Sequence, residues 1–449
     1  MAPLIIPPLL QRRSSDEYSP LPWRAEDRRA LDALADLTPE FAVDRRGTAA
    51  TLRAIDTAHG GGFYAVPEAA THDLDAADEL FAGREPVVDV QTHLVDPDKW
   101  SGSGADALAG FLRMADPDRW GGEIDLRLLD GAAWAACVFG ASETAIALLT
   151  STPGPSAVTV LSNPQIAAAR DVVDRYAGTG RVLTHTIVHP NASDAELDGM
   201  ERWRDELRPA GWKCYTLWGP PTAGSPTGGW FLDDDETGFR FLERVDALGP
   251  RVVAAHKGIG GPVPSASVAA ASPRDIGPAA AAFPEITFLV YHSGYERDPY
   301  GEEGTYNARS PHGVDRLVKS VRDAGIGIDG NVYAELGTTW FLMLRRPREA
   351  AHVLGKLLST LGPDRVVWGT DCAWYGSPQP LIDAFRAFNI PPAMQEEFGY
   401  PALDPDTKER ILSRNARRVY GIDAMPSTDR HWAAHAGFEL CHAITDAEG

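Results

Sequence analysis

The sequence predicts an α/β protein whose main domain is a (β/α)8 TIM barrel, with an N-terminal extension and an insertion after strand one. Short runs rich in Val, Ile and Leu alternate with amphipathic helical stretches, and eight such units fit between residues 86 and 423. Continuous apolar strands separated by helices are typical of a parallel sheet buried on both faces, and eight units match the barrel. A doubly wound open sheet is the alternative. It predicts a Gly-rich phosphate loop after the first strand, which the sequence lacks.

Each strand is expected where an apolar run is bounded by turn residues. The expected strands cover residues 87–93, 157–162, 181–189, 212–216, 251–256, 286–292, 332–336 and 365–371. The expected helices between them include residues 165–176, 194–207, 237–248, 314–324, 348–361 and 381–388. The insertion then spans residues 94–156, and we expect it to cover the mouth of the barrel.

The barrel domain is expected to cover residues 86–423, which leaves a segment on either side. Residues 1–85 are rich in Arg, Asp and Ala, with one expected helix near 24–36. We interpret them as an extension that packs on the barrel or makes an oligomer contact, and its length favours a homodimer. Residues 424–449 carry Trp432 and Phe438 and are interpreted as a C-terminal tail that docks on the barrel.

Charge and cysteine content narrow the class of protein. With 42 Lys and Arg against 63 Asp and Glu, the net charge is −21, so nucleic acid is not an expected partner. No window of the sequence approaches a membrane span, so a membrane is not expected either. None of the four cysteines forms a C-x-x-C pair, which favours a reducing, cytoplasmic setting. The expected partner is a small-molecule substrate.

Charged and imidazole side chains recur near the C-terminal ends of the expected strands, where (β/α)8 barrels place their chemistry. They are His93, His185, His189, Lys213, His256, His292, Glu335 and Asp371. A single residue of this kind is usually a core group satisfied by a neighbour, because a buried charge is costly without a partner. Several of them at one end of a barrel predict a shared polar site.

Four side chains at this end offer donors to a divalent metal ion. Gln91 and His93 share one face of strand one, as Asp89 also does, because side chains at i and i+2 point the same way. His256 and Asp371 enter from strands five and eight. One amide oxygen, two imidazoles and one carboxylate leave a coordination position for water, and a metal lowers the pKa of bound water towards neutrality. We expect Zn²⁺, with Mn²⁺, Mg²⁺, Fe²⁺ or Co²⁺ as alternatives.

The order of these residues resembles that of the amidohydrolase superfamily, in particular the branch that contains aminocarboxymuconate semialdehyde decarboxylase. That branch is a TIM barrel with a single metal. Its motifs are His-x-His or Glu-x-His on strand one, a His on strand five, a His before Ser-Gly on strand six, and an Asp after Trp-Gly-Thr or Trp-Gly-Ser on strand eight. The matching segments are Gln91-Thr92-His93, Ala255-His256-Lys257-Gly258, Tyr291-His292-Ser293-Gly294 and Trp368-Gly369-Thr370-Asp371. Residues 410–421, with their Asn-Ala pair, resemble the family's closing helix, and the resemblance covers about residues 86–423.

The resemblance implies that His93, His256 and Asp371 are metal ligands. It also implies that His292 is the acid or base that activates the metal-bound water or protonates the substrate. From the residues alone, His292 is a candidate base or a core His bonded to the backbone. Gln91 departs from the family, which has His there or, in some decarboxylating members, Glu. Because an amide oxygen is a poorer donor, this predicts weaker metal binding, tolerance of a harder ion, or a Gln91 that does not bind the metal. Loss of the metal altogether is a further alternative.

Three further residues are candidates for contact with the substrate. In two-metal members of the superfamily a Lys on strand four is carbamylated, but the single-metal branch uses no such bridge. We therefore interpret Lys213 as an unmodified catalytic cation that binds a substrate carboxylate or polarises a carbonyl, with a lysine whose head reaches water as the alternative. Glu335 is expected to bind substrate or to hold a His in place. Trp374 is expected to line an aromatic pocket or to pack within its loop.

Three functions are compatible with this pattern. The first is hydrolysis of a small-molecule amide, lactone or related carbonyl bond by metal-activated water, with Asp371 taking the proton or holding the water. The second is non-oxidative decarboxylation or hydration of a small aromatic or unsaturated carboxylic acid at the same site, which Gln91 favours because it stands where decarboxylases have Glu. The third is a metal-free barrel with a binding or non-hydrolytic biosynthetic role.

Overall fold

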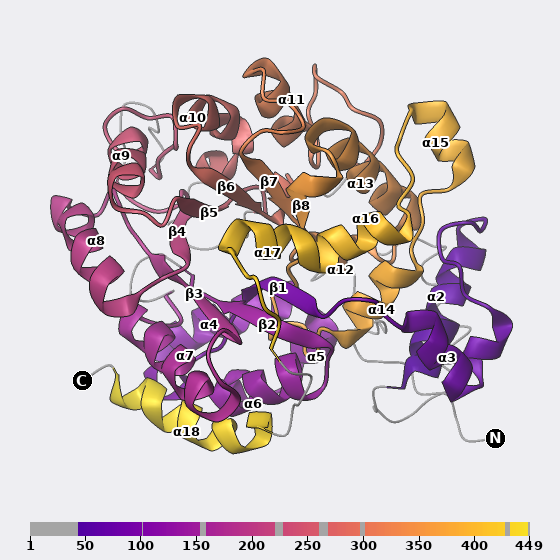
Figure 1. Ribbon diagram of the computed structural model, residues 1–449, viewed down its shortest axis with the longest axis horizontal. Helices are drawn as coiled ribbons and strands as arrows, with labels where there is room; N and C mark the ends of the chain where they lie inside the picture. Colours follow the sequence, from indigo (N-terminus) through magenta and orange to yellow (C-terminus); the bar gives the residue numbers. More distant parts are fainter. Residues whose placement is uncertain are drawn as a thin grey trace.

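The computed structural model describes residues 44–100, 102–152, 159–220, 228–259, 268–296, 301–426 and 432–447. Its strands are β1 Val87–Thr92, β2 Thr144–Leu149, β3 Val182–Ile187, β4 Gly211–Tyr215, β5 Val252–His256, β6 Thr287–Tyr291, β7 Val332–Glu335 and β8 Val366–Val367. They are parallel and follow one another in sequence order (Figure 1). Two hydrogen bonds between β1 and the segment after β8 close the barrel: Val90 N donates to Trp368 O at 3.0 Å, and Asp371 N donates to Gln91 O at 2.9 Å. The predicted (β/α)8 barrel is confirmed.

The second strand lies earlier in the chain than predicted. β2 is the run TAIALL, which is buried at every position. The prediction of a strand at 157–162 is wrong, because the described part of that segment forms no strand. Its last residue, Ser162, begins the next helix through a capping box with Gln165, and Leu161 is apolar because it packs in the same core as that helix. The insertion between β1 and β2 therefore covers residues 93–143, not 94–156.

Helices alternate with the strands around the barrel (Figure 1). They are α7 Asn163–Ala177, α8 Asp194–Leu207, α9 Gly238–Leu248, α10 Ile276–Ala282, α11 Asp315–Asp323, α13 Pro347–Leu361 and α14 Gln379–Ala387. All of them except α10 were predicted to within two residues at either end, because each has a 3.6-residue apolar period.

The other described helices lie before the barrel, in the insertion, in loops and at the C-terminus. They are α2 Arg45–Ala58, α3 Leu74–Phe81, α4 Gly102–Ala115, α5 Pro117–Trp120, α6 Gly131–Ala135, α12 Thr339–Met343, α15 Pro392–Phe398, α16 Pro405–Glu409, α17 Asn415–Tyr420 and α18 Trp432–Asp446. The helix expected near residues 24–36 lies outside the described residues.

Alternate side chains of the strands face two different cores. The apolar residues that fill the barrel interior include Val88, Ile146, Ala254, Leu289 and Val367. Residues between them in sequence, such as Val253, join a larger cluster shared with the surrounding helices. Ala416 of α17 packs with the interior cluster, and Asn415 donates to Val366 O at the start of β8. α17 therefore closes the N-terminal end of the barrel and leaves the C-terminal end for the polar residues.

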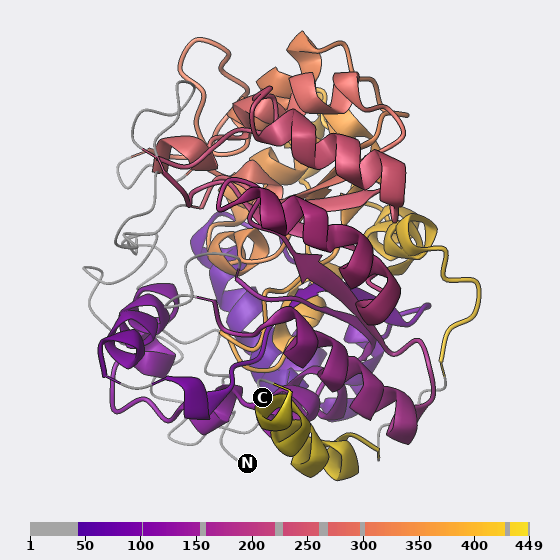
Figure 2. The same cartoon turned by 90° about the vertical axis from the view of Figure 1, so that its left-hand side faces the viewer.

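The C-terminal helix α18 packs on the insertion and on the barrel. It runs along α6 and α7 (Figure 2), and the rings of Phe139 and Trp432 are 4.9 Å apart. Gln165 Nε2 of α7 donates to Ile444 O at 3.0 Å. The apolar stretch at 134–139, which belongs to the insertion, therefore meets the end of the chain in a core of its own.

A buried ion cluster holds the loop after β6. Lys356 of α13 donates to Glu303 in that loop, and to Asp315 at the start of α11 at 2.6 Å. None of these three side chains is more than 4% exposed. Glu349 of α13 also accepts from Glu303 N at 2.9 Å. Burial, although opposed by Lys356, raises the pKa of Glu303 to about 7. The ion pair between Glu303 and Lys356 attaches the loop to α13.

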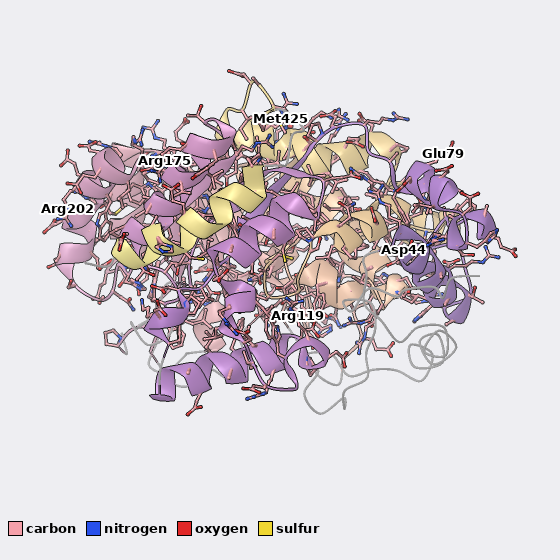
Figure 3. All side chains as sticks on the ribbon, turned by 90° about the horizontal axis from the view of Figure 1, so that it is seen from below. Asp44, Glu79, Arg119, Arg175, Arg202 and Met425 are labelled. Atoms are coloured by element: carbon pink, nitrogen blue, oxygen red, sulfur yellow. The ribbon has the colours of Figure 1, made fainter. Side chains whose placement is uncertain are left out.

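Charged side chains spread over the outside of the helices. Figure 3 shows Arg175 of α7 and Arg202 of α8 towards one end of the molecule and Glu79 of α3 at the other. None of the described helices is both long enough and apolar enough to cross a bilayer.

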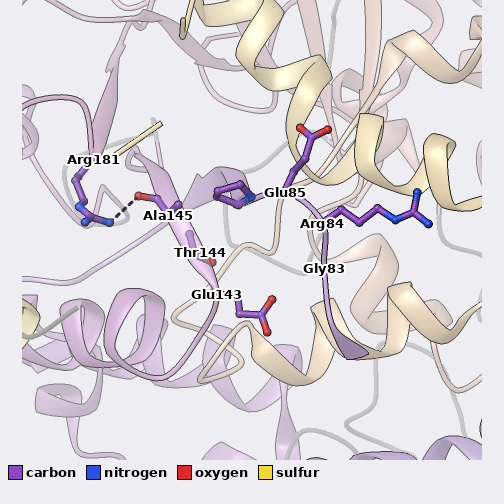
Figure 4. Close-up of a pocket in the computed structure, with 8 residues that line it drawn as sticks. Gly83, Arg84, Glu85, Glu143, Thr144, Ala145 and Arg181 are labelled. Atoms are coloured by element: carbon purple, nitrogen blue, oxygen red, sulfur yellow. Dashed lines mark hydrogen bonds between the residues drawn. The ribbon is translucent and has the colours of Figure 1, made fainter. Parts of the chain in front are cut away.

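A surface pocket opens beside the first residues of β1 and β2 (Figure 4). The charged residues Arg84, Glu85, Glu143 and Arg181 are part of its lining, and Arg181 donates to Ala145 O at 3.4 Å. Because these residues lie at the N-terminal ends of the strands, this pocket is at the opposite end of the barrel from the polar site below.

Candidate functional site

Four residues predicted at strand ends meet at the C-terminal end of the barrel. His93 follows β1, His256 is the last residue of β5, His292 directly follows β6, and Asp371 follows β8. All four are buried, and none is more than 7% exposed. The parallel strands therefore bring together side chains that are up to 278 residues apart in the sequence.

Both carboxylate oxygens of Asp371 have partners. Oδ1 lies 3.0 Å from His93 Nε2 and accepts from Gln91 Nε2 at 2.9 Å. Oδ2 accepts from Thr338 Oγ1 at 2.5 Å. Burial alone would raise the pKa of Asp371, but the contacts with His93 and Thr338 outweigh it and hold the pKa below its usual range. Asp371 is therefore an ionised carboxylate at neutral pH.

His93 presents one nitrogen to the backbone and the other to Asp371. Its Nδ1 lies 2.9 Å from the carbonyl oxygen of Thr150, just after β2. A carbonyl oxygen can only accept, so Nδ1 carries the proton of this bond. Nε2 is left facing Asp371 Oδ1.

His256 and His292 repeat this arrangement. His256 Nε2 lies 2.7 Å from Ile259 O, and His292 Nδ1 lies 2.8 Å from Gly337 O. Each of these nitrogens must donate, which leaves His256 Nδ1 and His292 Nε2 facing each other at 2.9 Å. Burial lowers the pKa of His256 well below its usual range and that of His292 to about 4, so neither ring holds a second proton at neutral pH.

The donor chemistry at this end fits a divalent cation. His256 Nδ1 and His292 Nε2 face each other at 2.9 Å with no proton between them, and two such nitrogens repel unless a cation lies nearby. The Asp371 carboxylate lies beside His93 Nε2, and imidazole and carboxylate are ligands that Zn²⁺ and related ions accept. The predicted four-ligand cluster is not assembled, however: within the described part of the chain, no three His, Cys, Asp or Glu donors converge on one point. The structure shows two facing pairs.

Lys213 of β4 is a buried cation without an acceptor. The residue is 0% exposed, and its Nζ has no hydrogen-bond partner among the described residues. Nζ lies 3.4 Å from the centre of the Tyr291 ring and 5.3 Å from that of Tyr215, so its contacts are aromatic faces. Burial lowers its pKa to about 7, against the opposing charges of Asp371 and Glu335. Its head does not reach water.

Glu335 at the end of β7 holds the backbone beside His292. Its Oε2 accepts from His292 N at 2.8 Å, and its Oε1 accepts from Gly337 N at 2.5 Å. A Cβ atom on Gly337 would lie 2.4 Å from Oε1, and one on Gly369 only 1.9 Å from it. The carboxyl group therefore fills the space that two glycines leave open, and burial raises its pKa to about 8. Of its two expected roles, these contacts support holding a His.

The comparisons with known proteins agree with this arrangement. The family described as Amidohydrolase matches residues 88–422, about three quarters of the chain. The chain belongs to the amidohydrolase family. Members of this family are metal-dependent hydrolases or decarboxylases, so the chain is an enzyme of this kind. The resemblance found in the strand-end motifs is confirmed.

Several solved structures are distantly similar to this chain. An uncharacterised TIM-barrel protein from Bordetella bronchiseptica is 14% identical, with a TM-score of 0.46 over 75% of this chain and 99% of that one. 2,6-Dihydroxybenzoate decarboxylase from Rhizobium is 15% identical, with a TM-score of 0.43 over 76% and 100%. A probable 2-pyrone-4,6-dicarboxylic acid hydrolase from Acinetobacter baumannii is 12% identical, with a TM-score of 0.45 over 75% and 100%. The comparison with curated proteins returned no match. Likenesses this distant carry no argument about the chemistry of this amidohydrolase.

Gln91 and Asp89 differ from the predicted arrangement of strand one. Gln91 donates from its amide nitrogen to Asp371, and its amide oxygen is buried without a hydrogen-bond partner among the described residues. Asp89 does not enter the mouth, because its carboxylate accepts from Thr370 N at 3.0 Å and from Thr370 Oγ1 at 2.5 Å. The pairing register of β1 shifts between Asp89 and Thr92, which breaks the simple i, i+2 alternation.

Two predicted strand-end histidines do not join the site. His185 Nε2 lies 3.0 Å from the hydroxyl of Tyr420 on α17, so this ring faces the closed end of the barrel. His189 lies beyond β3 and has a pKa lowered to about 4 by burial.

Trp374 packs against the site more than it lines a cavity. It is 1% exposed, and its ring stacks on His93 with centres 5.4 Å apart. Phe111 of α4 meets its other side at 5.5 Å. The insertion therefore reaches the barrel mouth through Phe111, and Trp374 is wedged between the insertion and His93.

Sequence reasoning missed two residues that contact the site, Thr150 and Thr338. The carbonyl of Thr150, which directly follows β2, orients His93. Thr338 donates to Asp371, and Tyr375 lies 2.9 Å from the Thr338 hydroxyl. Thr338, Asp371 and His292 have φ values of 54°, 62° and 60°. Such conformations are rare for these residues and concentrate at functional sites, but no sequence pattern reveals them.

Proposed function

We propose that this amidohydrolase uses a divalent metal to hydrolyse an amide, lactone or related carbonyl bond in a small anionic substrate. The observation that carries the proposal is the facing pair of unprotonated nitrogens on His256 and His292, at the same end of the barrel as the ionised carboxylate of Asp371 beside His93. We assign the metal to His93, His256 and Asp371. Two imidazoles and a carboxylate with a position left for water suit Zn²⁺, with Mn²⁺, Fe²⁺, Co²⁺ or Mg²⁺ as alternatives.

His292 is the proton carrier in this proposal. A divalent ion supplies a coordinated water of lowered pKa and a charge that polarises a carbonyl. His292 Nδ1 is committed to Gly337 O, so Nε2 is the nitrogen left to accept a proton at neutral pH. The low pKa of about 4 means that the ring starts neutral and returns the proton readily to a leaving group. Glu335 holds the backbone amide of His292 in place.

Lys213 binds the anionic group of the substrate in this proposal. Its ammonium is buried over Tyr291 without a hydrogen-bond acceptor among the described residues. A buried cation gains most from a partner of opposite charge that also accepts its hydrogen bonds. A substrate carboxylate or phenolate meets both needs.

Decarboxylation is the second candidate, and the surroundings of Lys213 favour it. A carboxylate held there lies against the faces of Tyr215 and Tyr291 rather than in water. Removal of water from a carboxylate raises its free energy relative to a product with spread charge. In that reaction His292 Nε2 first takes up a proton from solvent and then delivers it to carbon, as carbon dioxide leaves.

Metal content tests the proposal. Protein purified without chelator is expected to hold about one equivalent of metal by elemental analysis, while Asp371→Asn and His256→Ala hold little. His189→Asn, which changes a His outside the site, is the matched control and is expected to keep the metal. A wild-type content far below one equivalent, or loading that survives both ligand substitutions, would contradict the assignment.

Isotopes separate the two reactions once a substrate is found. In H₂¹⁸O, hydrolysis places ¹⁸O in the acid product. In D₂O, decarboxylation releases CO₂ and places deuterium on carbon.

A further inference from the structure

A chain of two hydroxyl groups stands behind Asp371. Tyr375 OH lies 2.9 Å from Thr338 Oγ1, and Thr338 Oγ1 donates to Asp371 Oδ2 at 2.5 Å. We propose that Thr338 and Tyr375 are positioning residues that fix the Asp371 carboxylate for metal binding through Oδ1. This inference rests on the proposed function, because it takes Asp371 to be a metal ligand.

The direction of the chain follows from what each group can donate. Asp371 is ionised and can only accept, so the single proton of the Thr338 hydroxyl is directed at Oδ2. The Tyr375 hydroxyl must then be the donor to Thr338. Burial raises the pKa of Tyr375 well above its usual range, so this phenol keeps its proton at neutral pH.

The backbone and the packing show that the chain is built into the fold. Thr338 has φ 54°, a conformation that is unfavourable for a β-branched residue. It immediately follows Gly337, whose carbonyl accepts from His292. Tyr375 is 4% exposed and stacks on Phe341 with ring centres 3.9 Å apart and planes 17° from parallel. Thr338 makes its hydrogen bond to Asp371 from this unfavourable conformation.

The chain determines what Asp371 can do. With Oδ2 engaged by Thr338 and Gln91 Nε2 donating to Oδ1, the carboxylate cannot rotate about its terminal bond without breaking two hydrogen bonds. It is therefore held as an ionised ligand and is a poor acceptor for a proton from water. The earlier expectation that Asp371 takes that proton gives way to His292 as the acceptor.

Zn²⁺ affinity separates positioning from a general structural role. Chelator-stripped protein is titrated with Zn²⁺ against a competing chromogenic chelator, for wild type, Thr338→Val, Thr338→Ser, Tyr375→Phe and Asp371→Asn. Thr338→Val keeps the shape but lacks the hydroxyl, and its affinity is expected to fall about 10–100-fold. Thr338→Ser keeps the hydroxyl and is expected to restore affinity to near the wild-type value. Tyr375→Phe is expected to weaken binding less than Thr338→Val. Thermal unfolding of each metal-free variant shows whether it is folded.

Thr338→Gly adds a second measurement that does not depend on the valine variant. Glycine tolerates φ 54°, so the metal-free Thr338→Gly protein is expected to be at least as stable as Thr338→Ser. It is nevertheless expected to bind Zn²⁺ as weakly as Thr338→Val, because it too lacks the hydroxyl. A structural role alone would make stability and affinity move together.

The outcomes distinguish this inference from the proposed function. If Asp371→Asn loses Zn²⁺ while Thr338→Val and Thr338→Gly bind it within about twofold of wild type, the positioning role is wrong and the ligand assignment stands. If Asp371→Asn itself binds Zn²⁺ like wild type, the proposed ligand set is wrong, and the role of Thr338 fails with it. Failure of Thr338→Ser to restore binding would also overturn the role of the hydroxyl.

Discussion

His292 Nε2 lies 2.9 Å from His256 Nδ1, and the second nitrogen of each ring faces a backbone carbonyl. Both tautomers are therefore set by the backbone, and both lone pairs point into the same space. The two rings are nevertheless assigned different roles: His256 as a metal ligand and His292 as the proton carrier. Both carbonyl groups belong to loops at the C-terminal end of the barrel, since Ile259 follows β5 and Gly337 follows β7, so these loops fix the orientation of both rings.

The proton-carrier role predicts the behaviour of His292→Asn. We expect kcat to fall by about 10²–10⁴-fold, because general acid or base catalysis contributes that much, while the metal content stays at the wild-type value. Steady-state kinetics on any substrate that the wild type turns over, together with elemental analysis, checks this. Metal loss as severe as in His256→Ala would instead show that His292 is a ligand.

Lys213→Met is predicted to stabilise the fold and to abolish substrate binding. Burial lowers the pKa of Lys213 to about 7, against about 10.4 in an unfolded chain. The unfolded state thus binds the proton more tightly, so the wild type carries its full penalty below pH 7 and loses it as the pH rises towards 10.4. The stability advantage of Lys213→Met in urea unfolding is therefore expected to shrink from pH 7 to pH 9, by up to about 1.4 kcal/mol per pH unit.

If the difference in unfolding free energy between Lys213→Met and the wild type stayed constant across that pH range, the pKa of Lys213 would not be lowered by burial. Lys99→Met changes a partly exposed lysine in the insertion and is the control that should show little pH dependence.

Gly369→Ala is predicted to destabilise the protein by about 1–3 kcal/mol, as overpacking does in cores. Its new Cβ would lie 1.9 Å from Glu335 Oε1, and the carboxyl group has no free space to move into. Gly110→Ala is the matched control, because nothing lies within 4 Å of a Cβ at that exposed position in helix α4. There the change is expected to stabilise by about 0.5–1 kcal/mol. Urea unfolding of both variants measures the contrast, and equal effects would contradict the crowded site.

Lys356→Ala is predicted to cost about 3–5 kcal/mol of stability, because it leaves buried carboxylates at Glu303 and Asp315 without their cation. Lys319→Ala removes an exposed i, i+4 ion pair with Asp323 and is expected to change stability by no more than about 0.5 kcal/mol. Thermal and urea unfolding compare the two. If Lys356→Ala proved as mild as Lys319→Ala, the loop after β6 would not depend on this cluster.

Much of the fold could be predicted because the apolar periods of strands and helices differ. Seven strands and six helices lie where their patterns placed them. The second strand did not, because the alanine-rich run at 144–149 has a weaker strand signature than the Val-Thr-Val-Leu segment, residues 158–161, that follows it. Burial makes both segments apolar, and periodicity alone cannot separate a strand from an apolar helix start.

The site was predicted at the level of residues but not of contacts. His93, His256, His292 and Asp371 could be found because imidazoles and carboxylates at strand ends are rare in a core. The roles of Gln91 and Thr338 could not be found, because they depend on a register shift in β1 and on a φ value of 54°. Neither feature leaves a mark in composition or spacing.

The carboxyl group of Glu335, seated where Gly337 and Gly369 have no side chains, has a consequence for redesign of this enzyme. These three positions behave as one unit, because either glycine can accept a larger residue only if position 335 becomes smaller at the same time. A library of variants that changes these positions one at a time would return mostly destabilised proteins. A library that changes all three together would sample different packing arrangements beneath the barrel mouth.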